Sequence, residues 1–109
     1  MVKYDDKYGE KNIIIGQYAE ENDEIIKNAK QSDLWFHLAK LPSCHVILSS
    51  NCKPLDNNMI KYCAQLTKEN SKYKNINLVT VNYTEIKNVK RTEKKGQVIL
   101  KGKINSLVI

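Results

Sequence analysis

Residues 34–48 constrain the fold more than any other part of the chain. They contain two short apolar runs, LWFHL at 34–38 and HVIL at 45–48, joined by a short connection. Aromatic and β-branched residues at this density favour strands, and the short connection predicts that the two strands pair antiparallel. Because side chains alternate across a strand, Trp35 and His37 are expected on one face and the other three side chains of the first run on the opposite face. The core is therefore predicted to form around this strand pair.

Two helices are predicted from the spacing of apolar residues. The run IIIG at 13–16 predicts a buried strand that stops at glycine, and the acids that follow predict a helix capped by Asn22 or Asp23. Apolar residues recur with helical spacing over residues 55–66, which predicts a second helix that ends near Asn70.

The remaining strands complete the expected architecture. Alternating β-branched residues predict a strand over 76–83. Residues 97–101 and 103–109 predict a terminal hairpin across Gly102. The length and the absence of a linker fit one domain over residues 1–109. We therefore expect an α+β fold, with a mixed, mainly antiparallel sheet and two helices packed on one side.

Charge is distributed unevenly along the chain. Residues 1–56 contain seven Lys and nine Asp or Glu, a net charge of −2. Residues 57–109 contain eleven Lys or Arg and three Glu, a net charge of +8, and the two halves together give the formal +6 of the whole chain. Such an excess in one half is typical of proteins that bind nucleic acid. A lysine-rich codon bias is the alternative, since Lys outnumbers Arg 17 to 1, but it does not explain the placement.

The densest basic stretch lies at residues 87–95, between two predicted strands. Basic clusters bind phosphates because each neutralised phosphate releases a counterion. A solvated hairpin rim without a partner is the alternative. Tyr62, Tyr73 and Tyr83 lie in the same half, where they can stack on bases or pack in the core. The predicted phosphate contacts are Lys72, Lys74, Lys87, Lys90, Arg91, Lys94 and Lys95.

Trp35, His37 and His45 form a second group of candidate contacts. The two histidines lie on strands that are expected to be neighbours, so they can meet a ligand on one face with Trp35 beside them. A structural role through hydrogen bonds is an equal alternative. A metal site would need further ligands, and the sequence shows no arrangement that supplies them, so no metal and no cofactor are predicted.

The sequence argues against several classes of protein. Glycines are isolated, so there is no glycine-rich phosphate loop. Cys44 and His45 are adjacent but point to opposite faces of a strand, which prevents them from acting as nucleophile and base. Three cysteines without a CxxC pair favour reduced thiols. Neither a signal peptide nor a transmembrane span is visible. We expect a soluble cytoplasmic protein that is not an enzyme.

Four segments in order resemble one known family. They are IGQYAEEND at 15–23, DLWFH at 33–37, LPSCHVIL at 41–48 and VNYTEIKNVKR at 81–91. Together they resemble the NFACT-R domain, the RNA-binding module of the NFACT ribosome quality-control proteins, over nearly the whole chain. The positions that match the family are Asp33, Trp35, His37, Pro42, His45, Lys87, Lys90 and Arg91.

The resemblance implies a partner that composition alone does not. NFACT proteins act on the large ribosomal subunit and on tRNA, and no catalytic site is attributed to this domain, so tRNA or rRNA is the expected ligand. We expect a stand-alone domain that binds structured RNA through its basic C-terminal half. The alternatives are a protein-interaction module that docks on a ribosomal or acidic protein, and a DNA-binding domain like a eukaryotic coiled-coil relative. The oligomeric state stays open.

Overall fold

The computed structural model describes residues 2–51 and 55–109. Within them lie eight strands, two α-helices and one short 3-10 helix. The strands are β1 (Lys3–Asp5), β2 (Ile13–Gly16), β3 (Leu34–Leu38), β4 (His45–Leu48), β5 (Thr80–Glu85), β6 (Val89–Arg91), β7 (Val98–Leu100) and β8 (Asn105–Val108). The helices are α1 (Ala19–Asn28), α2 (Asn57–Glu69) and the 3-10 turn η1 (Ile86–Asn88).

A six-stranded sheet forms the centre of the molecule, in the order β1-β2-β4-β3-β5-β8. Every recorded pairing in it is antiparallel, including the predicted pairing of β3 with β4. β6 and β7 form a separate two-stranded hairpin. The predicted α+β class with a mainly antiparallel sheet is confirmed.

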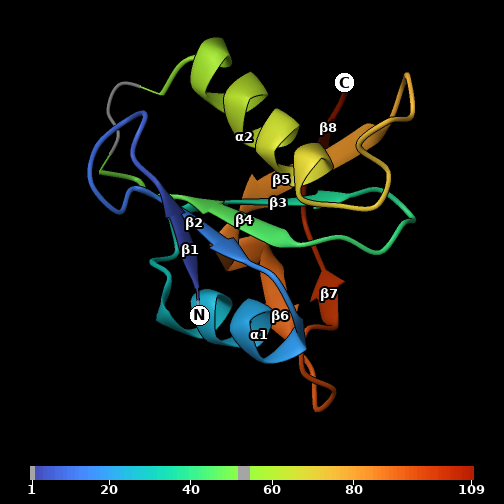
Figure 1. Cartoon of the computed structure of the whole chain (residues 1–109). Helices are drawn as coiled ribbons and strands as arrows, with labels where there is room; N and C mark the ends of the chain where they lie inside the picture. The colour runs from blue at the N-terminus through green and yellow to red at the C-terminus, as the bar shows by residue number, and fades with distance from the viewer. Residues whose placement is uncertain (1, 52–54) are drawn as a thin grey trace.

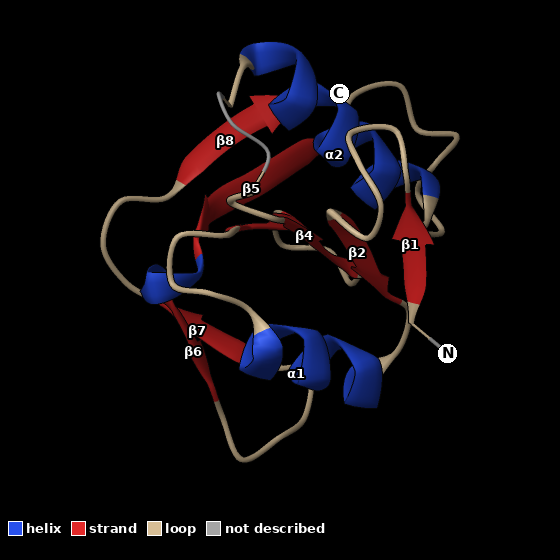
Figure 2. Cartoon of the chain, turned by 90° about the vertical axis from the view of Figure 1, so that its left-hand side faces the viewer, coloured by secondary structure: helices blue, strands red, loops and turns tan. Residues whose placement is uncertain are grey.

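The two helices lie on opposite faces of the sheet, with α2 above it and α1 below it in Figure 1 and again in Figure 2. The prediction that both pack on one side is wrong. β3 explains the difference, because both of its faces are apolar and both must be covered. Phe36 is buried in the cluster on the α2 face, and Trp35 is buried in the cluster on the α1 face, with the hairpin side chains Val98 and Leu100 beside it.

Local side-chain hydrogen bonds cap both ends of α2, whereas the side chain of Tyr18 does not cap α1. The Asp56 carboxylate caps α2 by accepting from the backbone N–H of Met59 at 2.9 Å. At the other end of α2, the Asn70 side chain donates to the carbonyl of Leu66 at 2.8 Å. α1 begins at Ala19, earlier than predicted. No helix in the described part of the chain combines the length and the apolarity needed to cross a lipid bilayer.

The C-terminal strands pair differently from the prediction. Residues 97–101 and 103–109 do not form a hairpin, because β7 pairs with β6 and β8 pairs with β5. Gly102 has a positive φ of 74°, and a Cβ there would lie 2.8 Å from Asn88 Oδ1, so the turn packs on η1 instead of closing a hairpin. β5 begins at Thr80 and not at Ile76, whose side chain is exposed.

Candidate nucleic-acid interface

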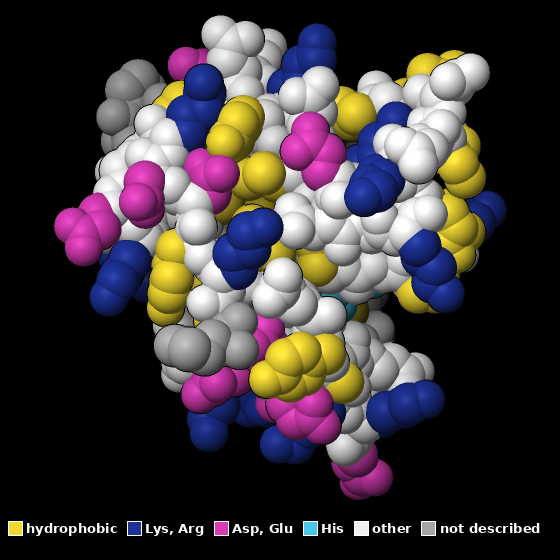
Figure 3. Space-filling view, viewed as in Figure 1, with side chains coloured by type: hydrophobic (Ala, Val, Ile, Leu, Met, Phe, Trp, Pro, Cys, Tyr) yellow, Lys and Arg dark blue, Asp and Glu magenta, His cyan; other side chains and the backbone are white. Residues whose placement is uncertain are grey.

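A groove of about 990 Å³ opens on the α1 face of the sheet. Its walls are the start of α1, the end of β3 with the connection to β4, and the β6–β7 hairpin. Figure 3 shows a notch there, with histidine surface at its base and Lys or Arg side chains above and below it. Of the candidate contacts predicted from the sequence, the groove is lined by Trp35, His37, His45, Lys94 and Lys95.

Trp35, His37 and His45 form one packed cluster at the base of the groove. The rings of Trp35 and His37 are parallel, with centroids 5.6 Å apart, and the His45 ring stands nearly perpendicular to both. The indole Nε1 of Trp35 donates to His45 Nδ1 at 3.1 Å. Trp35 and His45 are each 2% exposed, whereas His37 is half-buried, so His37 offers the most accessible ring of the three.

The hydrogen bonds fix which nitrogen of each neutral histidine carries the proton. His45 Nδ1 accepts from Trp35, so the proton of His45 lies on Nε2, which becomes a donor. His37 Nδ1 lies 2.7 Å from the carbonyl oxygen of Leu38, which can only accept, so the proton of His37 lies on Nδ1 and its Nε2 is an acceptor. Neither Nε2 has a recorded hydrogen-bond partner among the described residues. The cluster therefore holds one donor on the deeply buried His45 and one acceptor on the more accessible His37.

Burial keeps both rings neutral near pH 7. Desolvation, together with a smaller effect of the nearby His37, lowers the pKa of His45 to about 3. Desolvation also lowers the pKa of His37, although its hydrogen bond to Leu38 opposes the change. Positive charge in the groove must therefore come from its lysines.

Asn22 and Gly16 fix the backbone of His45 on the side of α1 and β2. The Asn22 side-chain oxygen accepts from the backbone N–H of His45 at 3.2 Å, across from α1 to β4. A Cβ on Gly16 would collide with that same oxygen and would lie 3.0 Å from the backbone nitrogen of Asn22. Asn22 was predicted to cap α1. It is instead a buried residue within the helix that positions the histidine strand.

The turn of the β6–β7 hairpin, at residues 92–97, carries two lysines into the groove. The Thr92 hydroxyl accepts from the backbone N–H of Lys94 at 3.2 Å and lies 3.1 Å from the carbonyl oxygen of Gln97. Gly96 has a φ of 82°, and a Cβ there would lie 3.0 Å from the Cα of Ala19. The turn is thus held against the start of α1, with Lys94 and Lys95 beside the histidines.

The groove is positively charged. Lys40, Lys94 and Lys95 line it, and no Asp or Glu is among the described residues that do. Lys40, from the connection after β3, was not predicted. The backbone of Lys40 has a positive φ of 62°. A sequence pattern does not predict this conformation for a lysine, so the position of Lys40 in the groove was not foreseen.

The other predicted phosphate contacts do not line the groove. Lys72 and Lys74 flank Tyr73, which packs against the cluster on the α2 face, across the sheet from the hairpin. Arg91 pairs with Asp23 of α1 at 3.1 Å, and Lys87 lies 3.5 Å from Glu85. Lys90 is exposed on β6 opposite Ile99, which is also exposed. The structure thus brings together only part of the basic half, and nucleic-acid contact by these five residues stays a prediction.

The sequence also missed Tyr18. It precedes α1, lines the groove and is 52% exposed. Tyr18 lies in an acidic segment of the negatively charged half of the sequence. The sequence therefore did not indicate that it lies near the hairpin that carries Lys94 and Lys95. Asp33, which matches the family, contacts the backbone. Its carboxylate accepts from the N–H groups of Lys30 and Ser50 at 2.9 and 2.7 Å.

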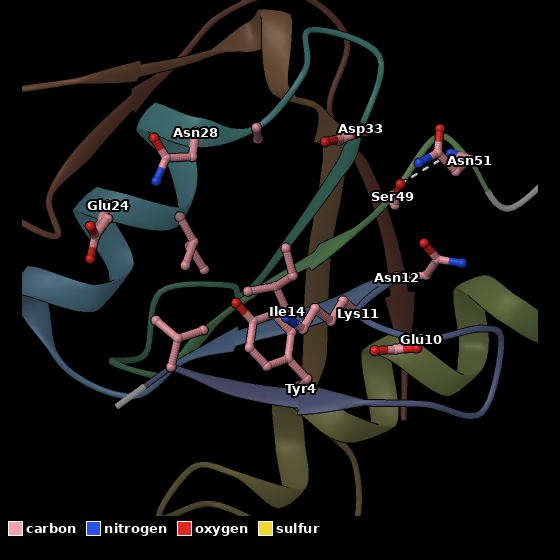
Figure 4. Close-up of a pocket in the computed structure, with 13 residues that line it drawn as sticks. Tyr4, Glu10, Lys11, Asn12, Ile14, Glu24, Asn28, Asp33, Ser49 and Asn51 are labelled. Carbon is pink, nitrogen blue, oxygen red and sulfur yellow. Dashed lines mark hydrogen bonds between the residues drawn. The ribbon is translucent and has the colours of Figure 1, made fainter.

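A second pocket of about 460 Å³ has the opposite charge. Glu10, Glu24 and Asp33 line it together with Lys11, whose ammonium lies 5.6 Å from the centre of the Tyr4 ring. Figure 4 shows Tyr4 and Lys11 near the centre of this pocket, with Glu24 at one side and Glu10 and Asp33 at the other. The excess of carboxylates makes this pocket unfavourable for phosphates.

Among the described residues, no group of three or more His, Cys, Asp or Glu is placed to hold a metal ion. Cys44 and Cys63 are buried thiols, and Cys52 lies outside the described residues. Burial raises the pKa of the Cys44 thiol to about 11, and Cys44 lies in the α2-face cluster, away from the His45 side chain.

Known proteins share both the sequence and the fold. "Coiled-coil domain-containing protein 25" from Danio rerio is 36% identical over 88 residues, which cover 73% of this chain and 41% of that protein. "Rqc2 homolog RqcH" from Streptococcus suis is 36% identical over 80 residues, which cover 72% of this chain and 14% of that protein. The chain thus spans less than half the length of either relative.

A solved structure has a similar fold. "The structure of the C-terminal of the fibronectin/fibrinogen-binding protein from Streptococcus suis" superposes with a TM-score of 0.79 at 31% identity, over 91% of this chain and 41% of that one. The profile of the family described as "NFACT protein RNA binding domain" matches residues 1–106. The histidine groove lies within the matched region, and the chain belongs to the NFACT-R family.

Proposed function

We propose that this domain binds RNA in the histidine groove and acts in ribosome quality control. The observation that carries the proposal is the composition of the groove, in which Lys40, Lys94 and Lys95 line the walls around a neutral histidine pair and no Asp or Glu is among the described lining residues. Such a site attracts a polyanion and offers directed hydrogen bonds at its base. The family description and the RqcH relatives support the same function. Membership of a binding-domain family favours binding over catalysis.

The ligand that we propose is structured RNA, either tRNA or rRNA of the large ribosomal subunit, in the cytoplasm. The lysines supply contacts to phosphates that are independent of sequence, and the histidine pair supplies contacts that depend on the shape of the RNA. Trp35 is nearly inaccessible, so it contributes by orienting His45.

Binding of tRNA across a salt series tests the proposal. We expect Lys94→Ala with Lys95→Ala to weaken binding and to reduce the slope of log affinity against log salt by about 2, because about one counterion is lost for each phosphate contact. Lys72→Ala with Lys74→Ala is the matched control, since it removes the same charge on the α2 side and should change the slope much less. Equal effects of the two pairs would favour docking by the whole basic half. Absence of binding at low salt would reject an RNA ligand.

Protein interaction is a second candidate function, and exposed apolar residues favour it. Leu78 is 74% exposed and Ile76 is 48% exposed, and both border a pocket at the start of β5. Leu78→Lys should abolish such an interaction while leaving tRNA binding unchanged. Pull-downs that resist nuclease would support this alternative, and competition between tRNA and duplex DNA would reveal a preference for DNA.

A further inference from the structure

We infer that the groove takes one unpaired nucleotide of the RNA, with its base stacked on Tyr18. This inference rests on the proposed RNA-binding function and specifies the part of the RNA that is recognised. It comes from three features of the groove: an exposed aromatic ring, apolar walls, and a fixed donor and acceptor at the base.

The walls of the groove suit a base better than a phosphate. Leu41, Pro42, Val98 and Leu100 line it together with the lysines and the histidines. A site for phosphate alone needs positive charge and N–H groups and gains nothing from apolar walls, whereas a base has two apolar faces to bury. A volume of about 990 Å³ is at the upper end of the range for small-molecule sites, and it can admit a nucleotide.

Tyr18 offers the stacking surface. The residue is 52% exposed, and it is the only tyrosine among the lining residues that the structure describes. Its backbone is extended just before α1, and the turn at Gly96 packs against the next residue, Ala19. Tyr18 is therefore held next to the turn that carries Lys94 and Lys95, so one nucleotide can meet the ring with its base and the lysines with its phosphates.

The histidine pair provides the polar end of the site. His37 Nε2 accepts and His45 Nε2 donates, in tautomers that Leu38 and Trp35 fix. The polar edge of a base, with donors and acceptors side by side, matches such a pair. Bases in a continuous duplex keep their faces stacked and their edges paired, so only an unpaired nucleotide can reach both the ring and the histidines.

Three probes test the inference by fluorescence anisotropy: a fully paired RNA hairpin, the same hairpin with one bulged nucleotide in its stem, and a mixture of the four nucleoside monophosphates. We expect tighter binding of the bulged hairpin by about five- to hundredfold, the range that one stacked base supplies. Tyr18→Ala should remove this preference and Tyr18→Phe should keep it. Tyr4→Ala is the control, because Tyr4 is 45% exposed but lines the acidic pocket.

Each other outcome has a distinct meaning. If both hairpins bind equally, RNA binding stands and the unpaired-nucleotide inference is overturned. If neither binds, the proposed function fails as well. Monophosphates that bind as tightly as the bulged hairpin would assign the groove to free nucleotides and overturn the inference. A preference for the bulge that survives Tyr18→Ala would overturn the assignment of Tyr18. Circular dichroism confirms that each variant is folded.

Discussion

At the scale of single residues, the histidine cluster shows how burial sets protonation. His45 is 2% exposed, and its Nδ1 is occupied by the indole of Trp35. A charged imidazolium there would lose its hydration and would also lose the hydrogen bond that Nδ1 accepts. Neutral His45 is therefore part of the stable fold, and its acid–base behaviour is measurable.

The depressed pKa of His45 predicts loss of stability on acidification. The unfolded chain binds a proton at His45 near pH 6.5, whereas the folded protein resists protonation until about pH 3. Between these values each unit of acidification should lower the free energy of unfolding by about 1.4 kcal/mol for this one group. Above pH 6.5 both states are neutral and the contribution of His45 is constant.

Denaturant unfolding between pH 7 and pH 5 measures this effect. His45→Asn keeps an acceptor for Trp35 but cannot titrate, so its stability should fall less steeply than that of the native protein. His37 titrates in both proteins and cancels in the comparison. Parallel curves for the two proteins would contradict the burial of His45.

At the scale of elements, the groove depends on how closely α1 approaches β2 and the hairpin. Gly16 ends β2 under Asn22, and Gly96 brings the hairpin turn onto Ala19. The Arg91–Asp23 pair joins the hairpin to α1, but its arginine side chain is 42% exposed, so it contributes at most about 1 kcal/mol. Close backbone contact at the two glycines therefore sets the width of the groove.

Gly16→Ala should destabilise the protein through α1. The new Cβ would collide with Asn22 Oδ1, which accepts from the His45 N–H, and relief of that contact must shift the helix or break the bond. We expect a loss of about 1–3 kcal/mol, typical of overpacking. Urea unfolding of Gly16→Ala, Asn22→Ala and the double variant measures it. The cost of Gly16→Ala should shrink in the Asn22→Ala background, and an unchanged cost would show that the two residues are not coupled.

At the scale of the whole molecule, one sheet links two cores. The side chains of β3 alternate between the α2-face cluster, which holds Phe36, and the α1-face cluster, which holds Trp35. Both clusters include side chains of β3, so unfolding of one cluster would remove β3 from the other. The groove lies on the α1 face, so its stability should be that of the entire domain.

We therefore expect a single unfolding transition. Trp35 is the only tryptophan, and its fluorescence reports on the α1 face, whereas far-UV circular dichroism is weighted toward α2, the longer helix. Midpoints in urea should coincide for the two signals. Fluorescence that changes at lower urea would show that the α1 face and the hairpin open separately from the α2 face.

The sequence by itself determined the local features of this protein. Alternation in residues 34–38 predicted which side chains of β3 share a face, and the four motifs predicted the family, which the comparisons confirm. These are properties of neighbouring residues, whose periodicity follows directly from strand and helix geometry.

Only the tertiary structure decided which distant residues meet. Long-range packing decides which face of the sheet each helix covers and which strand each C-terminal strand pairs with. It also decides that the groove brings together Tyr18, Lys40, the two histidines and only two of the predicted lysines. An apolar pattern predicts that a surface must be buried, but it does not predict which element covers that surface, because the hydrophobic effect is non-directional. Close contacts such as those of Gly16 with Asn22 and of Gly102 with the Asn88 side chain accompany the observed choice of partners.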